Sequence, residues 1–352
     1  MSVTLFPTAT YPATTPRRQP VRSGASSSSA DFLSLVRSDL EAVEARMASD
    51  LGSEGRIVYT LTQHVMNAGG KRLRPAMVAL SARAINPEIS PERLATVGAA
   101  VEFVHMATLM HDDVVDNTAT RRGKPTANAI FGNGVAVLSG DYILARAMRL
   151  LSMDGDLRII RTVSEITIDM SEGEVIEISA TGDANLLEET YLEILRKKTA
   201  VFVEGCCRCG AILAGATESQ EAALADYGYR LGMAFQLADD LLDYTGDPAI
   251  TGKPRGSDLK DGRATLPFML ALGEATEEER NTLLTSFGNA DLEDAGVVRV
   301  CAILERYGAF TRTREVASTY VEQSTKALAL LPDSPARDSF LQLTDYVIQR
   351  DR

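Results

Sequence analysis

The spacing of apolar residues constrains the fold of this chain more than any other feature. Over residues 31–352 these residues recur at intervals of three and four, and alternating strand-like runs are scarce. In the first such stretch, Phe32, Val36 and Leu40 fall on one stripe of a helix. No short repeat stands out, so the pattern predicts a single all-α domain, a helical bundle with short loops.

Helix-start signals sharpen the prediction in places. Ser90 is expected to be an N-cap, with Pro91 at the first helical position. Beyond the first stretch, helices are predicted at 75–85, 91–117, 134–151, 156–180, 188–216, 218–244, 264–272, 276–287, 294–307, 309–330 and 335–350.

Residues 1–30 differ in composition from the rest of the chain. They are rich in Ser, Thr, Pro and Arg and contain no acidic residue, which predicts a disordered N-terminal tail. Two interpretations stay open. A plain tail goes with a cytoplasmic protein, and an organelle transit peptide goes with a plastid or mitochondrial one.

The bulk composition excludes several classes of protein. A formal net charge of -12 argues against nucleic acid as a partner, because such binding rests on a basic surface. No apolar run approaches the roughly 20 residues needed to cross a bilayer, so the chain is predicted not to be transmembrane. Cys206, Cys207 and Cys209 lack the spacing of a zinc site and fit small side chains packed within a helix.

A dense group of acidic residues lies at the end of the helix predicted for 91–117. Asp112 and Asp116 are four residues apart and share a helix face, with Asp113 to one side and His105 about two turns earlier. Carboxylates at this density repel each other, and the C-terminal end of a helix is an unfavourable place for them. A cation is therefore expected beside them.

A second acidic group repeats this geometry. Asp239, Asp240 and Asp243 have the same relative positions, on a helix whose flanks are apolar enough to be buried. Either group alone fits a solvated helix end. Because Mg²⁺ prefers oxygen ligands and often bridges carboxylates to substrate phosphates, the two groups together predict a metal cluster over a diphosphate.

Basic residues complete the predicted site. The motif GGKRLRP places Lys71, Arg72 and Arg74 in a glycine-led loop just before a helix, which suits an anion. Arg121 and Arg122 follow the first acidic group within a short loop. The acidic groups are thus expected to hold metal, and the arginines to hold phosphates directly.

These motifs, in this order, resemble those of the trans-type polyprenyl diphosphate synthases. The resemblance covers roughly residues 40–350 and rests on four segments: GGKRLRP, DDVVDNTATRRGK, KKTA and FQLADDLLDYTGD. It implies an isoprenoid synthase-like bundle around a deep central cavity, usually a homodimer. It also implies condensation of an allylic diphosphate with isopentenyl diphosphate, with about three Mg²⁺ ions per active site.

The resemblance assigns roles residue by residue. Five residues are expected to bind isopentenyl diphosphate: Lys71, Arg72, Arg74, His105 and Arg122. The allylic diphosphate is expected at Arg121, Lys198, Lys253 and Lys260. The metal is expected at Asp112, Asp116 and Asp239, with Asp113, Asp240 and Asp243 completing the motifs. Thr199 and Gln236 are expected to face the reacting carbons, and Lys198 is expected to be catalytic with them. Pro254, which follows Lys253, departs from the family pattern.

Product length is expected to follow from the residues that precede the first acidic group. Thr108 lies one turn before Asp112, Ala107 slightly more and Val104 about two turns, and none is aromatic. By the resemblance, small residues here imply an open channel and a product longer than C20, with Met148 near its floor. The alternative is that Ala107 merely allows close helix packing.

The sequence therefore predicts a Mg²⁺-dependent prenyltransferase of octaprenyl or solanesyl type, with peripheral membrane contact for product release. Alternatives within this fold are a farnesyl or geranylgeranyl diphosphate synthase and a non-catalytic subunit of a heteromeric synthase. A terpene cyclase is disfavoured because GGKRLRP and the second acidic group are both present.

Overall fold

The computed structural model describes residues 32–51, 72–121, 123–247 and 255–348, which belong to one compact unit. The all-α expectation is confirmed, since helices make up nearly all the regular structure of these ranges. The predicted disordered tail (1–30) and the site residues Lys71, Arg122 and Lys253 lie outside the described residues.

The regular elements are as follows. The α-helices are α1 (Arg37–Asp50), α3 (Leu73–Ile85), α4 (Pro91–Val115), α5 (Ala127–Phe131), α6 (Asn133–Asp154), α7 (Leu157–Ala180), α8 (Glu188–Leu195), α9 (Val201–Leu213), α10 (Glu218–Thr245), α12 (Ser257–Asp261), α13 (Leu266–Glu274), α14 (Glu277–Ser286), α15 (Asp294–Arg306), α16 (Ala309–Ala327) and α17 (Pro335–Ile348). Shorter elements are the 3₁₀ turns η1 (Ser34–Val36) and η3 (Leu328–Leu330), the π-helical turn η2 (Arg196–Ala200), and the strands β1 (Thr120–Arg121) and β2 (Lys124–Pro125).

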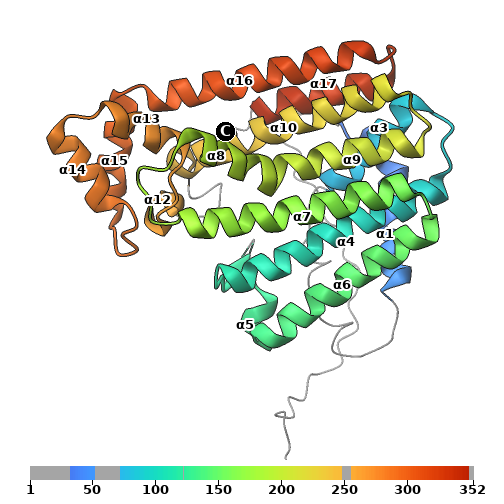
Figure 1. The fold of residues 1–352 in the computed structure, drawn as a ribbon, viewed down its shortest axis with the longest axis horizontal. Helices are drawn as coiled ribbons and strands as arrows, with labels where there is room; N and C mark the ends of the chain where they lie inside the picture. Colours follow the sequence, from blue (N-terminus) through green and yellow to red (C-terminus); the bar gives the residue numbers. More distant parts are fainter. Residues whose placement is uncertain (1–31, 52–71, 122, 248–254, 349–352) are drawn as a thin grey trace, which may run out of the picture. The chain divides into compact units, whose positions relative to one another are not determined.

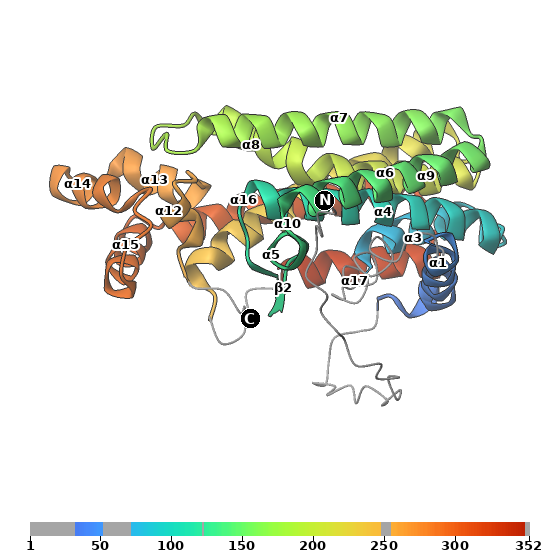
Figure 2. The ribbon, with the colours of Figure 1, turned by 90° about the horizontal axis from the view of Figure 1, so that it is seen from below.

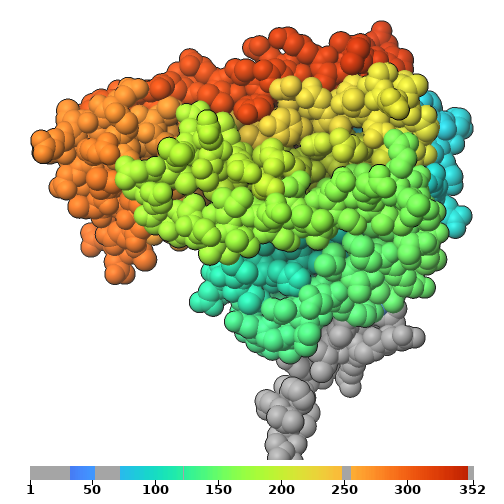
Figure 3. Space-filling view, in the orientation of Figure 1, coloured from blue at the N-terminus to red at the C-terminus, as the bar shows by residue number. Residues whose placement is uncertain are grey.

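Two long helices organise the bundle. α4 packs against α6, α1 and α3, whereas α10 packs against α9 and α16. Figure 1 shows α12 to α15 gathered at one end of the bundle. Figure 2 shows α7 as one outer layer, with α17 on the opposite side, and Figure 3 shows the exposed surface of α7 in green.

Local signals explain where the helices begin. Pro91 opens α4, as predicted, although the Ser90 side chain makes no capping hydrogen bond. α10 starts with a capping box in which Thr217 and Gln220 satisfy each other's backbone N–H groups.

Helix α4 is central in the core. Among the described residues, it alone is long and apolar enough to cross a membrane, but 78% of that apolar stretch is buried inside the protein. A buried helix with apolar residues all round is what the interior of a bundle requires. α4 is therefore a core helix of this fold.

The helix predicted for 188–216 contains an irregularity that periodicity does not reveal. It consists of α8, the π-helical turn η2 and α9. A Cβ on Gly173 of α7 would lie 2.7 Å from Lys197 Cβ, and one on Gly232 of α10 would lie 2.6 Å from Ala200 Cα. Two glycines therefore let neighbouring helices approach the π turn from both sides, and such turns occur frequently at functional sites.

Candidate functional site

The first acidic group lies where α4 ends, and its members differ in environment. Asp113 is buried, and its carboxylate accepts a hydrogen bond from Nε of Arg121 at 2.8 Å. Asp116 is exposed, and its Oδ1 lies 3.3 Å from Nη2 of Arg263. Asp112 is partly buried between them. Asp112 and Asp116 are thus the members available to a ligand, whereas Asp113 anchors the loop that follows.

The carboxyl group of Asp112 lies in an environment with too little positive charge. Its pKa is raised to about 6, mainly by burial. The carboxylates of Glu174 and Asp116 also raise this pKa, by more than Lys198 and Arg121 lower it. An excess of negative charge around a partly buried carboxylate is a typical environment for a bound cation.

The second acidic group also divides by environment. Asp239 is exposed on α10. Asp243 accepts hydrogen bonds from the backbone N–H groups of Ser257 and Asp258, each at 3.1 Å, and so holds the start of α12. Asp240 is buried, with both carboxylate oxygens engaged by protein donors. Asp240 and Asp243 are thus held by protein donors, as Asp113 is in the first group, and which of the six aspartates bind metal stays a prediction.

Arg263, just after α12, joins the two acidic groups. Its guanidinium pairs with Asp116 of α4 at 3.3 Å and with Asp258 of α12 at 3.6 Å. Asp258 in turn donates its backbone N–H to Asp243. Burial, with Asp243 and Asp240 nearby, raises the pKa of Asp258 well above its usual range. The ends of α4 and α10 therefore border one polar region.

Two glutamates of α7 extend this region, and the sequence reasoning did not identify them. Glu174 and Glu177 both pair with the ammonium of Lys198 in the π turn, Glu174 at 3.1 Å. These carboxylates raise the pKa of Lys198 despite its burial, so that it stays charged. Their three-residue spacing places them on one face of α7, but the sequence does not reveal that this face meets the KKTA motif. Arg263 and Asp258 were likewise not identified from the sequence.

A hydrogen-bonded chain links the π turn to α10. Thr199 Oγ1 donates to Gln236 Oε1 at 3.0 Å, and Gln236 Nε2 donates to Asp240 Oδ1 at 2.9 Å. The hydroxyl of Tyr191 donates to Asp240 Oδ2 at 2.7 Å. Thr199 and Gln236, predicted to act together, are in direct contact, whereas Tyr191 was not predicted.

The basic residues at the start of α3 separate into two environments. Nη1 of Arg74 donates to Nε2 of His105 at 3.0 Å, and the guanidinium stacks 4.7 Å above the ring of Phe202. Arg72 instead pairs with buried Glu102 at 2.7 Å and with Glu44 at 3.2 Å. Arg74 and His105 are thus brought together as predicted, but Arg72 ties α3 to α4 and α1.

The residues predicted to set product length line the core side of α4. Val104 and Ala107 are buried, while Thr108 is partly accessible and donates its hydroxyl to the backbone oxygen of His105 at 2.9 Å. Met148 on α6 is partly buried against the same core. A cavity along this path stays a prediction.

The donor set suits Mg²⁺, although the protein groups alone do not form a complete cage. Within the described ranges, no three His, Cys, Asp or Glu side chains lie close enough together to hold a metal ion. Mg²⁺ commonly takes one or two carboxylates and completes its shell with water and substrate phosphate. Asp112, Asp116 and Asp239, all oxygen donors in a region of excess negative charge, fit that pattern.

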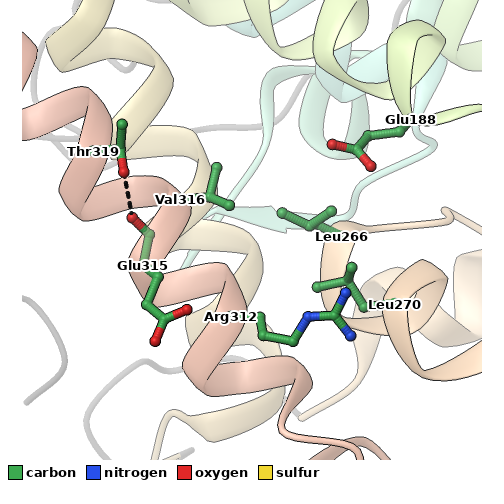
Figure 4. Close-up of a pocket in the computed structure, with 7 residues that line it drawn as sticks. All are labelled: Glu188, Leu266, Leu270, Arg312, Glu315, Val316 and Thr319. Carbon is green, nitrogen blue, oxygen red and sulfur yellow. Dashed lines mark hydrogen bonds between the residues drawn. The ribbon is translucent and has the colours of Figure 1, made fainter. Parts of the chain in front are cut away.

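A separate pocket of about 340 Å³ lies between α8, α13 and α16. Its lining includes Glu188, Leu266, Arg312 and Val316, and Figure 4 shows these side chains converging from the three helices. No aspartate of either motif contributes to it. This pocket is therefore distinct from the acidic site.

Comparisons with known proteins point in one direction. A family model described as Polyprenyl synthetase matches residues 55–304. The octaprenyl diphosphate synthase of Escherichia coli (strain K12) is 38% identical over 318 residues, which is 90% of this chain and 98% of the relative. A short chain isoprenyl diphosphate synthase of Methanothermobacter thermautotrophicus is 34% identical over 82% of this chain and 89% of its own length.

Solved structures give the same result for the fold. The crystal structure of a decaprenyl diphosphate synthase from Rhodobacter capsulatus matches with a TM-score of 0.85 and 37% identity. The match covers 91% of this chain and 98% of that one. The structural match thus covers most of the chain, and the residues matched by the family model include both acidic motifs.

Proposed function

This chain belongs to the polyprenyl synthetase family, and we propose that the acidic site between α4 and α10 is where it condenses isopentenyl diphosphate with an allylic diphosphate. It is a prenyltransferase that forms a long-chain trans-polyprenyl diphosphate. The observation that carries the assignment is that Arg263 pairs with Asp116 of the first motif and with Asp258, whose backbone N–H donates to Asp243 of the second motif.

The chemistry requires charge stabilisation more than a nucleophile. The allylic C–O bond breaks, the double bond of isopentenyl diphosphate attacks the resulting cation, and a proton is lost to the departing diphosphate. Stabilisation is most effective where charge develops. Lys198 and Arg121 neutralise the leaving diphosphate, and Arg74 with His105 holds the other substrate. In this scheme no side chain of the protein forms a covalent bond with the substrate.

Thr199 and Gln236 face the reacting carbons in this proposal. The Thr199 hydroxyl proton is used in the hydrogen bond to Gln236, which leaves oxygen lone pairs on both side chains. Oxygen lone pairs suit an allylic cation. The π turn supports the role of Thr199, since it moves this residue out of the regular helical register.

Mg²⁺ is proposed to be held by Asp112 and Asp116 from α4 and Asp239 from α10. When bound, the metal neutralises diphosphate charge and so makes the diphosphate a better leaving group. The raised pKa of Asp112 supports a cation at this place, because burial beside Glu174 leaves that carboxylate short of positive charge.

A product longer than C20 is the proposed outcome of this site. Val104, Ala107 and Thr108 offer small or aliphatic side chains on the α4 face that precedes Asp112. A growing chain that runs along this face meets no aromatic ring among these three residues. The octaprenyl, nonaprenyl and decaprenyl relatives support the same length class.

A homodimer is proposed with α7 at the interface. Ile168, Val175 and Ile178 are spaced by seven and three residues along one face of α7, and each is more than half exposed. Leu138 on α6 is 69% exposed. Figure 3 shows the green surfaces of α6 and α7 adjoining on one side of the molecule. Apolar side chains in such a row are typical of a face covered by a second copy.

Two alanine variants test the metal assignment. Asp112→Ala and Asp239→Ala are each expected to lower turnover by about 10²–10⁴-fold, because removal of a group that stabilises developing charge has effects of that size. Glu305→Ala, an exposed acid of α15, is the control and should retain full turnover. Circular dichroism must show an intact fold in all three proteins. Near-normal turnover in either aspartate variant would contradict the assignment.

A further inference from the structure

Tyr191 on α8 is buried, and nothing in the reaction described above uses its hydroxyl. Only 3% of the residue is exposed, and the hydroxyl donates to Asp240 Oδ2 at 2.7 Å. The backbone of Leu266, at the start of α13, also bonds to this hydroxyl. A buried tyrosine aimed at a buried carboxylate on another helix is a fixed contact, because neither group can turn to water.

The second oxygen of Asp240 is equally committed. Oδ1 accepts a hydrogen bond from Nε2 of Gln236 at 2.9 Å, one turn earlier on α10. In its charged form Asp240 only accepts hydrogen bonds, and it then selects the amide orientation in which the NH₂ group of Gln236 points toward it. The opposite end of the amide, Oε1, then faces Thr199 and accepts its hydroxyl proton at 3.0 Å.

The hydrogen bonds therefore converge on Asp240: Thr199 donates to Gln236, and both Gln236 and Tyr191 donate to Asp240. We propose that Tyr191 is a positioning residue that, through Asp240, fixes the amide of Gln236 with its oxygen toward Thr199 and the reacting carbons. In this assignment two neighbouring aspartates of the second acidic motif have different roles. Asp239 faces the metal and Asp240 is an anchor, which explains why Asp240 is buried although its neighbour is exposed.

The consequence of losing the anchor is specific. Without the tyrosine hydroxyl, Asp240 keeps a single side-chain contact and can rotate, and the amide of Gln236 is no longer held in one orientation. A turned amide would present N–H donors to an allylic cation in place of an oxygen. The chemical step should suffer, while substrate binding by the diphosphate groups should not. The inference rests on the proposed function, since it assigns a role within that reaction.

The test compares two buried tyrosines that lose only a hydroxyl. Tyr191→Phe removes the anchor, whereas Tyr227→Phe removes a fully buried hydroxyl that bonds Phe340 and Thr344, neither of which belongs to either acidic motif. With Mg²⁺, isopentenyl diphosphate and farnesyl diphosphate, Tyr191→Phe should lower kcat about 10–100-fold, with KM changed by less than about threefold. Tyr227→Phe should keep kcat within about twofold, with a comparable loss of melting temperature.

A double-mutant cycle separates positioning from general stability. If Tyr191 acts through Gln236, Tyr191→Phe should lower kcat by less than about twofold when it is added to Gln236→Ala. An undiminished further loss in that background would overturn the inference. So would a kcat for Tyr191→Phe that equals the kcat of Tyr227→Phe. The second result, with an active wild type, leaves the proposed function standing, whereas an inactive wild type rejects both.

Discussion

Nη2 of Arg263 lies 3.3 Å from Oδ1 of Asp116, although 147 positions separate the two residues in the sequence. The pair connects the end of α4 to the segment after α12, which Asp243 holds at the end of α10. The Arg263 guanidinium thus contacts the first acidic motif directly and is linked to the second through Asp258. Loss of Arg263 should therefore disturb the ends of both α4 and α10.

Arg263→Ala is therefore expected to lower turnover by about 10-fold or more and to reduce unfolding stability by about 1–2 kcal/mol, because it leaves a partly buried carboxylate cluster without its shared cation. Arg280→Ala is the control. Arg280 bonds Leu272 and Asn185, outside the acidic site, and turnover should stay within about twofold of wild type. Equal activity in the two variants would show that Arg263 has no role in the site.

Because the pKa of Asp112 is raised, replacing this residue by a neutral one should stabilise the protein by an amount that depends on pH. Folding raises this pKa from 3.8 to about 6, so the folded state binds the proton more tightly than the unfolded chain does. Unfolding stability therefore falls as the pH rises between these two values, and the whole loss is present above pH 6. In buffer with a chelator, Asp112→Asn should stabilise the protein at pH 8 by about 1–3 kcal/mol.

Urea unfolding at pH 4 and pH 8 measures this difference. Near pH 4 the gain should largely disappear, because Asp112 is then protonated in the folded wild type. Asp291→Asn, at an exposed position before α15, provides the control and should show no such pH dependence. A gain that is equal at both pH values would mean that the charge of Asp112 is not destabilising.

A bulky ring at Thr108 should shorten the product. Thr108 is partly accessible on the α4 face one turn before Asp112, so a phenylalanine can project from it without displacing the buried core. We expect Thr108→Phe to release mainly C15 or C20 diphosphate, with the first condensation slowed by less than about tenfold. Chromatography of the dephosphorylated products measures this. An unchanged product length would place the elongation channel elsewhere.

A charged α7 face should prevent dimer formation. Val175→Glu combined with Ile178→Glu places two carboxylates in the exposed apolar row, where burial against a second copy would be strongly unfavourable. Light scattering after size-exclusion chromatography should show a dimer for the wild type and a monomer for the variant. Leu330→Glu, at another position where a large apolar residue is exposed, should remain dimeric. A dimeric double variant would exclude this face as the interface.

The sequence predicted the long helices well because their apolar spacing is regular and their starts are marked. The predicted 91–117 and 218–244 helices differ from α4 and α10 by only one or two residues at their ends. The hairpin of β1 and β2 and the short helices α5 and α12 were not predicted. Helices of five residues are too short to show a period, and tertiary contacts stabilise them.

The sequence singled out the aspartates of the site, but it did not show which of them are exposed and which are held by other side chains. Spacing alone makes Asp239 and Asp240 equivalent, whereas the fold exposes one and buries the other beside Tyr191. Glu174 and Glu177 could not be assigned from α7 alone, because their role depends on Lys198, which lies on a separate element in the fold. Such pairings are set by helix packing.

The most direct test of the account is the product formed by the purified chain alone. With Mg²⁺, farnesyl diphosphate and excess isopentenyl diphosphate, the account predicts an all-trans prenyl diphosphate longer than C20 and no product when a chelator removes the metal. An end product of C15 or C20 would contradict the assigned chain length. Failure to form any product, under conditions in which the octaprenyl diphosphate synthase of Escherichia coli is active, would contradict the assigned function.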